Sequence, residues 1–493
     1  MIGELSEWAC GLRPGDVPDR VRALAVSQLL GHLGAVCAGA RHGAGRRILR
    51  LGAPFGDDPA RSAYAMAALS MLLDFDDTVF AGHVSHSAVG VPLSYARRAG
   101  LDGDRLLLSI VAATEVAARV TAAATLGPFR GQTAAHTHLA GAVAGRCVAE
   151  GRDAATMREA LGLAFAQPPW TLDHAFFGSD AKTLVAATPL RAGLDAVDAA
   201  AAGLLGAPDL LEHPAGFLAR FSTTPLPQAA GGLGRRWHTD TLSIKVHPGC
   251  AYLDAAIDAA VALSRQVADR FDQISSVDVD ASIFTVGMEE RSAPYLDGPG
   301  SGLAALNFST GYSVAAALRR GRLEVEDFEA PRLQDGEVWR VARLVRVRHD
   351  PEVTRRALLA AAPLGAALRL AGPEGARWLA GGAGVAEDEA LALLGEPEAT
   401  FEAAEKAVGA RLRVGFADGS ELAAAVDVPE GAAGAAMRAG HREVARTKLV
   451  RNAAPLLGEP EAARLAAAVE ALPGADAPQV AALMDGLRDA LQG

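Results

Sequence analysis

The chain has 493 residues, of which 50% are hydrophobic and 21% are charged, and its formal net charge is −11. This length allows two or three domains of ordinary size. The composition favours a large buried core and excludes a disordered chain. An acidic chain without a basic stripe has no electrostatic footprint for nucleic acid, so we expect no nucleic-acid partner.

Cysteine usage and the N-terminus indicate a cellular compartment. The 4 cysteines are widely spaced and form no C-x-x-C pair, so they predict neither a disulfide framework nor a zinc site. The first residues, MIGELSEWACGLRPGD, are acidic and unlike a signal peptide. Arg, Asp or Gly interrupts the longest apolar tracts before about 18 residues, so we expect no membrane-spanning helix. We therefore expect a cytoplasmic protein.

Lysine is rare in this chain. Of 47 basic residues, the lysines are Lys182, Lys245, Lys406 and Lys448. Where arginine serves for charge alone, a lysine indicates a position that needs a compact, titratable ammonium group. The alternative is that these four positions arose by chance.

The first half of the chain has the hydrophobic spacing of helices and no segment that alternates with a period of two. The helices that we predict span residues 21–40, 63–73, 104–126, 134–149, 153–165 and 182–205. A loop rich in proline and aromatic residues, 167–180, precedes the last of them.

The pattern changes after residue 270. Residues 274–283 and 338–348 alternate between apolar and polar, which predicts half-buried strands. The pair Asp418-Gly419 lies between two alternating runs and predicts a hairpin. From residue 434 the helical pattern returns and continues to the end.

These patterns predict a mainly α protein with an inserted α+β lid. A large all-α domain would be built from both chain ends, residues 1–265 and 431–493. A smaller α+β domain would span residues 266–430.

The densest group of polar residues lies in MLLDFDDTVFAGHVSHSAVGVP, residues 71–92. If the preceding helix continues through the aspartates, Asp74, Asp77 and Thr78 share one face. Carboxylates, a hydroxyl group and two imidazoles this close together suit proton transfer on a small polar substrate. The alternative is an acidic helix end with surface histidines.

Other segments carry candidate groups. In SIKVHPGCAYLD, residues 243–254, Lys245 and His247 precede a Pro-Gly turn that opens a helix, and a helix N-terminus beside a lysine favours an anion. The alternative is an ordinary turn after a strand-like segment. In GSDAK, Lys182 opens a helix. His136 and His138 are two residues apart in a helix and point to different faces.

We expect no metal and no organic cofactor. His83 and His86 could share a metal only if their loop were helical, which Gly82 and Ser85 disfavour. The glycines of LAGGAGVAED, residues 379–388, follow no strand and lie in no βαβ unit, so they do not predict a dinucleotide site.

Four motifs occur in a recognisable order. They are DFDDT followed by histidine and VP, GSDAK before an alanine-rich helix, KVHPGC with AIDA downstream, and NFSTGYSVAAAL. Together, from about residue 5 to about residue 490, they resemble the MmgE/PrpD family, which includes 2-methylcitrate dehydratase, cis-aconitate decarboxylase and iminodisuccinate epimerase. The resemblance implies an all-α domain with an inserted lid and an active site between them. It also implies a small di- or tricarboxylate substrate, no cofactor, and a homodimer.

The resemblance also implies site residues. The matched positions are Asp74, Thr78, His86 with His83 as its competitor, Lys182, Lys245 and Tyr312. One position departs from the family pattern. The family usually has a histidine in a G-x-H-P-T segment, and this chain has Gln132 at that position. Either His136 or His138 takes its place, or the catalytic set is altered.

We therefore expect a cofactor-independent lyase, and among lyases a dehydratase. Lys182 and Lys245 would hold substrate carboxylates, and His86 or His136 would remove the proton next to a carboxylate. Tyr312 or the other histidine would protonate the departing hydroxyl group.

Asp74 would orient a histidine. The predicted substrate-binding residues are Thr78, His83, His138, Gln132 and His247. Decarboxylation or epimerisation would use the same groups in another way. An alternative of a different class is a catalytically silent dimeric scaffold or binding protein, which the missing histidine supports.

Overall fold

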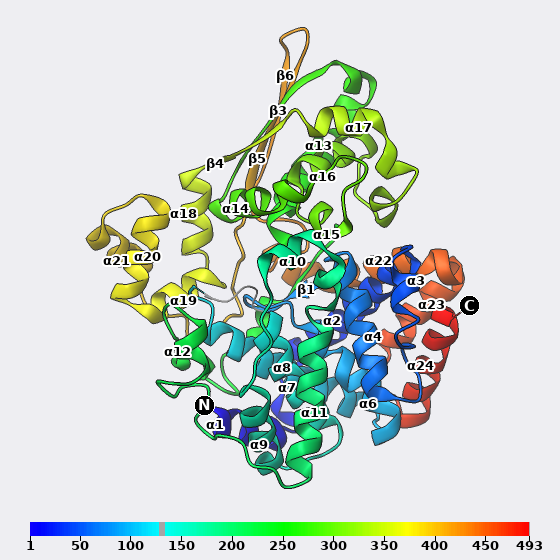
Figure 1. The fold of residues 1–493 in the computed structure, drawn as a ribbon, viewed down its shortest axis with the longest axis vertical. Helices are drawn as coiled ribbons and strands as arrows, with labels where there is room; N and C mark the ends of the chain where they lie inside the picture. The colour runs from blue at the N-terminus through cyan, green and yellow to red at the C-terminus, as the bar shows by residue number, and fades with distance from the viewer. Residues whose placement is uncertain (128–133, 493) are drawn as a thin grey trace.

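The structure is a computed structural model that describes residues 1–127 and 134–492. The described residues are mainly helical, with one four-stranded sheet and one two-stranded ribbon. Helices from both ends of the chain fill the lower body in Figure 1, and the sheet and its helices stand above them. The predicted combination of a mainly α chain with a smaller α+β part is confirmed.

The N-terminal half of the chain supplies most helices of the body. They are α1 (Ile2–Gly11), α2 (Asp19–Arg41), α3 (Gly45–Ile48), α4 (Pro59–Leu72), α5 (Ser85–Ala88), α6 (Gly90–Ala99), α7 (Gly103–Ala123), α8 (Ala134–Ala149), α9 (Ala154–Ala164), α10 (Asp173–Gly178), α11 (Ala187–Ala201) and α12 (Phe217–Phe221). The helix predicted to open at Lys182 begins later, because a 3₁₀ turn, Asp180–Leu184, holds that lysine first.

Helices α2 and α7 form the centre of the body. Both are long and apolar enough by mean hydropathy to cross a membrane, although Gly31 interrupts the apolar tract of α2, and Glu115 and Arg119 interrupt that of α7. Their most hydrophobic windows are 89% and 94% buried against other helices of the protein. Helices that are apolar all round and covered in this way are core helices.

Helix α4 leads to the functional site and packs closely on α2. A Cβ atom at Gly39 of α2 would lie only 2.1 Å from the carbonyl oxygen of Leu69. Glycine at this position therefore allows the two helix backbones to touch.

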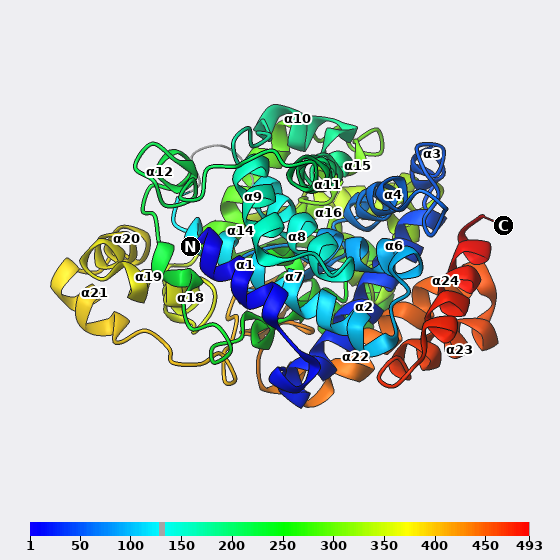
Figure 2. The same ribbon diagram turned by 90° about the horizontal axis from the view of Figure 1, so that it is seen from below.

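Helices from the N-terminal and C-terminal segments pack together. The C-terminal helices are α22 (Ala435–Leu457), α23 (Glu459–Glu470) and α24 (Ala477–Gln492). Helix α22 packs along α2, and α24 packs against α6, as Figure 2 shows from below.

The sheet has the strand order β4-β3-β5-β6. Its strands are β3 (Ile274–Ala281), β4 (Val345–His349), β5 (Ala410–Phe416) and β6 (Glu421–Val426). Strand β3 runs parallel to β4 and antiparallel to β5, and β5 and β6 form a hairpin. Gly419 in the hairpin turn has a φ of +83°, so the hairpin predicted at Asp418-Gly419 is confirmed.

The strand predicted over residues 338–348 is wrong in its first part. Residues Gly336–Ala342 form helix α17, and only Val345–His349 form a strand. The carboxylate of Asp335 accepts hydrogen bonds from the backbone N–H groups of the first helical turn. This cap favours a helix over the alternating pattern.

Helix α13 (Asp254–Val267) packs on the sheet together with α16 (Thr310–Arg320). It therefore lies with the α+β part, before the boundary predicted at residue 265. The other helices between β3 and β4 are α14 (Ile283–Ser292), α15 (Leu303–Leu306) and α17.

A lobe of four helices lies between β4 and β5. It consists of α18 (Pro351–Leu359), α19 (Leu364–Ala371), α20 (Pro373–Ala383) and α21 (Glu387–Leu394). The lobe projects to the left in Figure 1, away from the C-terminal helices.

Candidate functional site

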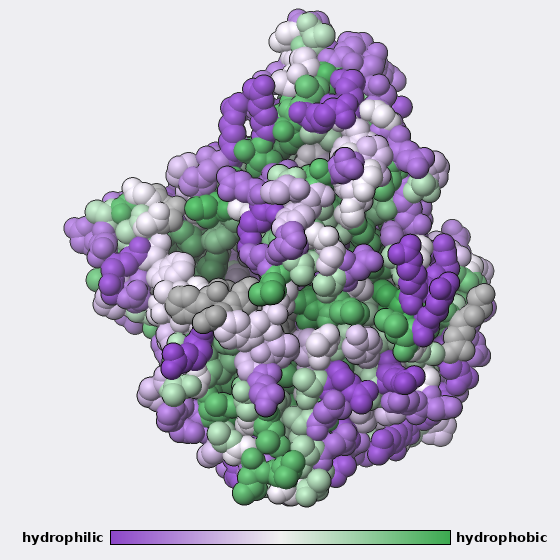
Figure 3. Space-filling view, in the orientation of Figure 1, coloured by the Kyte–Doolittle hydropathy of each residue, from purple (hydrophilic) through white to green (hydrophobic). Residues whose placement is uncertain are grey.

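A cavity of about 1030 Å³ lies where the helical body, the α+β part and the lobe of α18–α21 meet. In the space-filling view, a hollow lined by hydrophobic residues opens between the lobe and the body (Figure 3). Its polar lining residues include Thr78, His83, Lys245, Tyr252, Asp254 and Lys406.

The segment that reaches the cavity is not a helix end. Helix α4 stops at Leu72, and Asp74 has a φ of +51°, in the left-handed region that aspartate tolerates better than most residues. The chain then forms strand β1 (Asp77–Thr78), which pairs antiparallel with β2 (Ser243–Ile244). The helix face predicted for Asp74, Asp77 and Thr78 is therefore wrong.

All four lysines of the chain surround this segment, and each is at least nine-tenths buried. Each ammonium group donates to a backbone carbonyl oxygen between residues 71 and 78. The contacts are Lys182 to Met71 (3.4 Å), Lys245 to Asp74 (2.6 Å), Lys448 to Phe75 (2.5 Å) and Lys406 to Thr78 (3.2 Å).

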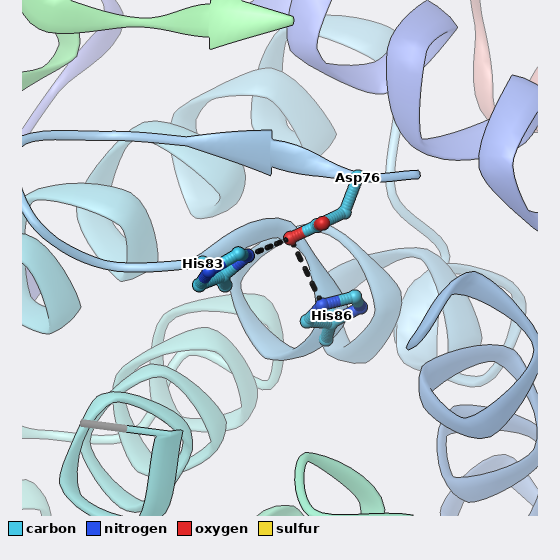
Figure 4. A group of neighbouring side chains, drawn as sticks. All are labelled: Asp76, His83 and His86. Atoms are coloured by element: carbon cyan, nitrogen blue, oxygen red, sulfur yellow. Dashed lines mark hydrogen bonds and ion pairs between the residues drawn. The ribbon is translucent and has the colours of Figure 1, made fainter. Parts of the chain in front are cut away.

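Asp76 is the centre of the buried polar network. One carboxylate oxygen lies 2.7 Å from Nδ1 of His83 and 3.1 Å from Nε2 of His86, as Figure 4 shows. The other accepts a hydrogen bond of 2.9 Å from Lys245. Burial alone would raise the pKa of Asp76, but His83, Lys245 and His86 outweigh it and hold the pKa well below its usual range. Asp76 is therefore ionised.

The structure separates the two candidate histidines. His83 lines the cavity, and its side chain is 31% exposed. With Asp76 ionised, Nδ1 of His83 donates to it, and Nε2 is the ring nitrogen left to face a ligand. His86 is fully buried behind it, with Nδ1 2.7 Å from the hydroxyl oxygen of Ser70.

The two lysines predicted to hold substrate carboxylates are already paired. Nζ of Lys182 and Nζ of Lys245 lie 3.5 and 3.4 Å from one carboxylate oxygen of Asp74. Burial would lower the pKa of Lys245, but Asp74 and Asp76 raise it above its ordinary value. Lys245 borders the cavity, whereas Lys182 and Asp74 lie behind the lining residues.

Lys406 lines the cavity and has no carboxylate within ion-pair distance among the described residues. Nζ donates to the hydroxyl and carbonyl oxygens of Thr78, at 2.9 and 3.2 Å. Burial lowers the pKa of Lys406 to about 7. A buried ammonium group without a counter-ion favours the binding of an anion. The rarity of lysine is the one sequence signal that indicates this residue.

Two further polar residues, Asp254 and Tyr252, border the same cavity. Asp254, the first residue of α13, is 5% exposed, and its Oδ1 has no hydrogen-bond partner among the described residues. Burial holds the pKa of Asp254 well above its usual range, which favours the protonated form. Burial also raises the pKa of Tyr252 to about 12. Both residues lie in the segment 243–254, and the sequence pattern predicts a role for neither.

Two predicted residues lie away from the cavity. The Tyr312 hydroxyl donates to the backbone carbonyl of Asp327, and its ring lies 4.9 Å from that of Trp339. Nε2 of His247 lies 2.8 Å from a carboxylate oxygen of Asp258 in α13. Neither Tyr312 nor His247 lines the cavity, so the structure does not bring them to the other site residues.

The histidines of α8 also lie away from it. His136 packs edge-on against Phe217 and Phe221, and neither ring nitrogen has a hydrogen-bond partner among the described residues. Burial lowers the pKa of His136 to about 3. His138 lies behind His86, with ring centroids 5.3 Å apart. Gln132, the position of the missing family histidine, lies outside the described residues.

Asp76, His83 and His86 form a group that could hold a metal ion, because their ligand atoms all lie within 4.8 Å of one another. The expectation of no metal considered the two histidines alone and did not include the carboxylate between them. Lys245 already binds this carboxylate, and its positive charge would oppose a second cation there. The geometry fits a hydrogen-bonded aspartate–histidine pair better than a metal centre.

Two domain families match the chain. Residues 3–229 match the MmgE/PrpD N-terminal domain, and residues 247–366 match the MmgE/PrpD C-terminal domain. The chain belongs to the MmgE/PrpD family. No curated protein matches the chain. Members of the MmgE/PrpD family are generally enzymes, including dehydratases and decarboxylases. Asp76 and His83 lie within the N-terminal match, whereas Lys406 lies outside both matched ranges.

Proposed function

We propose that this protein is a cofactor-independent lyase, a dehydratase that acts beside a carboxylate group. The observation that carries the proposal is the His83–Asp76 pair, which borders the same cavity as Lys406, a buried lysine without an acidic partner among the described residues. A base held by a buried carboxylate and a site for an anion are the two parts that such a reaction needs.

Lys406 receives the substrate carboxylate in this mechanism. Two of its three N–H groups are bound by Thr78, which leaves one for the ligand. Charged hydrogen bonds of this kind contribute about 1.5–3 kcal/mol. The carboxylate would supply the missing counter-charge and would return the pKa of Lys406 toward its ordinary value.

His83 removes the proton next to the carboxylate. The hydrogen bond from Nδ1 to Asp76 fixes the ring and stabilises the imidazolium that forms when Nε2 takes the proton. Lys245 holds Asp76 on its other side, so the carboxylate that orients the base cannot turn away.

Asp254 protonates the departing hydroxyl group. Its buried, protonated carboxyl group has an oxygen without a partner and faces the same cavity as His83. Tyr252, which borders the same cavity, is the alternative proton donor to the departing hydroxyl group. A positioned acid or base typically contributes about 10²–10⁴-fold, so electrostatics and positioning supply the rest of the rate.

The test is hydrogen exchange in D₂O, followed by ¹H NMR, with citrate, 2-methylcitrate, cis-aconitate and N-substituted aspartates as the first panel. Exchange of the proton next to a carboxylate shows the first step of dehydration or epimerisation, whereas decarboxylation places solvent deuterium on the carbon that CO₂ leaves. Formation of an alkene, release of CO₂ or inversion of a stereocentre then distinguishes dehydration, decarboxylation and epimerisation.

The panel also includes carboxylates with longer apolar substituents. No exchange with any member, in protein that is folded by circular dichroism, would overturn the lyase and favour the catalytically silent binding protein. Exchange that persists unchanged in Lys406→Met would overturn the assigned carboxylate site.

A further inference from the structure

The cavity is much larger than its polar end. Pockets for drug-sized ligands measure about 300–1,000 Å³, and this cavity of about 1030 Å³ lies at the upper end of that range. A small di- or tricarboxylate bound at Lys406 would leave most of the space empty.

The rest of the lining is largely apolar and comes from other elements than the polar end. Helix α14 contributes Phe284 and Met288, and the lobe contributes Leu358, Leu364, Leu368 and Trp378. Such side chains contribute to the binding free energy of an apolar ligand in proportion to the apolar surface that is buried when the ligand binds.

Trp378 of α20 lies where the lobe meets the helical body. A Cβ atom at Gly127 would lie 3.1 Å from the Trp378 ring, so the lobe reaches the end of the helical body there. Trp378 is 39% exposed, and both residues line the cavity. A large aromatic side chain that is exposed inside a cavity offers a flat apolar surface to a ligand.

The cavity offers little positive charge for further carboxylates. Arg291 and Arg377 line it, but Arg291 pairs with Asp173, and Arg377 pairs with Glu374. Lys245 is paired as described above. Among the described lining residues, Lys406 is the basic side chain without an acidic partner.

We infer that the substrate carries one carboxylate on an apolar body, an alkyl chain or a ring system, that fills the space between α14 and the lobe. The inference rests on the proposed function, because Lys406 must take the carboxylate. The lobe residues after position 366 lie outside the family match, so this part of the chain would set a specificity of its own.

The experiment measures binding by isothermal titration with tricarballylate, hexanoate, octanoate and decanoate. We expect the affinity to rise with chain length, by up to about fourfold per added methylene group, and to exceed that of tricarballylate. Trp378→Ala should weaken decanoate binding at least about fivefold and leave hexanoate less affected. Trp170→Ala is the matched control, because Trp170 is 41% exposed and does not line the cavity.

Lys406→Met separates the two proposals, because it keeps the length of the side chain and removes its charge. Decanoate binding that falls in both Trp378→Ala and Lys406→Met supports the inference. Tighter binding of tricarballylate than of decanoate, with no effect of Trp378→Ala, overturns the inference and leaves the proposed function in place. Decanoate binding that survives Lys406→Met overturns the carboxylate site and the proposed function together.

Discussion

The loop that carries His83 and the first turn of α8, which carries His136, place the same residue type in opposite environments. His83 binds an ionised carboxylate and lines the cavity, whereas His136 is enclosed by phenylalanine rings without a hydrogen-bond partner among the described residues. Burial disfavours a charged imidazole, and a neighbouring carboxylate favours it. The residue that a histidine contacts therefore decides whether it is suited to proton transfer. The spacing of histidines in the sequence does not show which residue that is.

The largest expected effect is on turnover. His83→Asn removes the base, so we expect kcat for the substrate found in the D₂O panel to fall about 10²–10⁴-fold. The thermal midpoint should stay close to that of the parent. His213→Asn is the control, because His213 is an exposed histidine away from the cavity. Parent-like turnover in His83→Asn would remove this residue from the mechanism.

The next effect is on stability. Asp76→Asn removes the carboxylate that Lys245 and both loop histidines contact, and breaking a buried ion pair typically costs about 3–5 kcal/mol. Urea unfolding measures this free energy. Asp77→Asn is the matched control, since Asp77 is equally buried and accepts hydrogen bonds from Gln28 and Ser85 but forms no ion pair with another described residue. Equal losses in both variants would contradict the central role of Asp76.

Lys406 should make stability depend on pH. Its pKa is about 7 in the folded protein, below its ordinary value, so between about pH 7 and pH 10 the unfolded chain binds a proton that the folded protein does not. Over this window its contribution to stability rises by up to about 1.4 kcal/mol per pH unit.

Lys406→Met removes this contribution. The variant should therefore be stabilised most, relative to the parent, below pH 7, and the difference should shrink as the pH rises. Urea unfolding from pH 6 to pH 10 measures it. A difference that is independent of pH would show that Lys406 has an ordinary pKa.

The smallest effect concerns His136. His136→Phe replaces two unpartnered ring nitrogens with an apolar ring among phenylalanines, so we expect a change within about 1 kcal/mol at pH 7. Because the pKa of His136 is about 3 when folded, the parent loses stability as the pH falls from about 6.5 toward 3. The variant should lose less over that range. A loss of several kcal/mol at pH 7 would show that His136 has a polar partner.

The residue pattern alone predicted much of the framework. The helical spacing of the first half, the hairpin at Asp418-Gly419 and strand β3 all appear in the structure, because each depends on neighbours in the chain. The family motifs also led to a true family relationship. The strand predicted over residues 338–348 was wrong, because a local cap at Asp335 outweighed the alternating pattern.

The site was predicted less completely. The motifs brought Asp74, Thr78, Lys182 and Lys245 to one region, but Tyr312 bonds to a backbone carbonyl elsewhere. The raised pKa of Asp254 could not be predicted, since it depends on burial by residues that are distant in the sequence.

The sequence by itself determined the helical framework, the family and the rarity of lysine. Tertiary structure decided which histidine reaches the cavity, which lysine lacks a counter-ion, and how much apolar surface surrounds the polar end. The physical reason is that Asp76, Lys245 and Lys406 come from segments far apart in the chain. Their contacts and exposure exist only once α4, the β1–β2 ribbon and the segment that carries Lys406 are packed together.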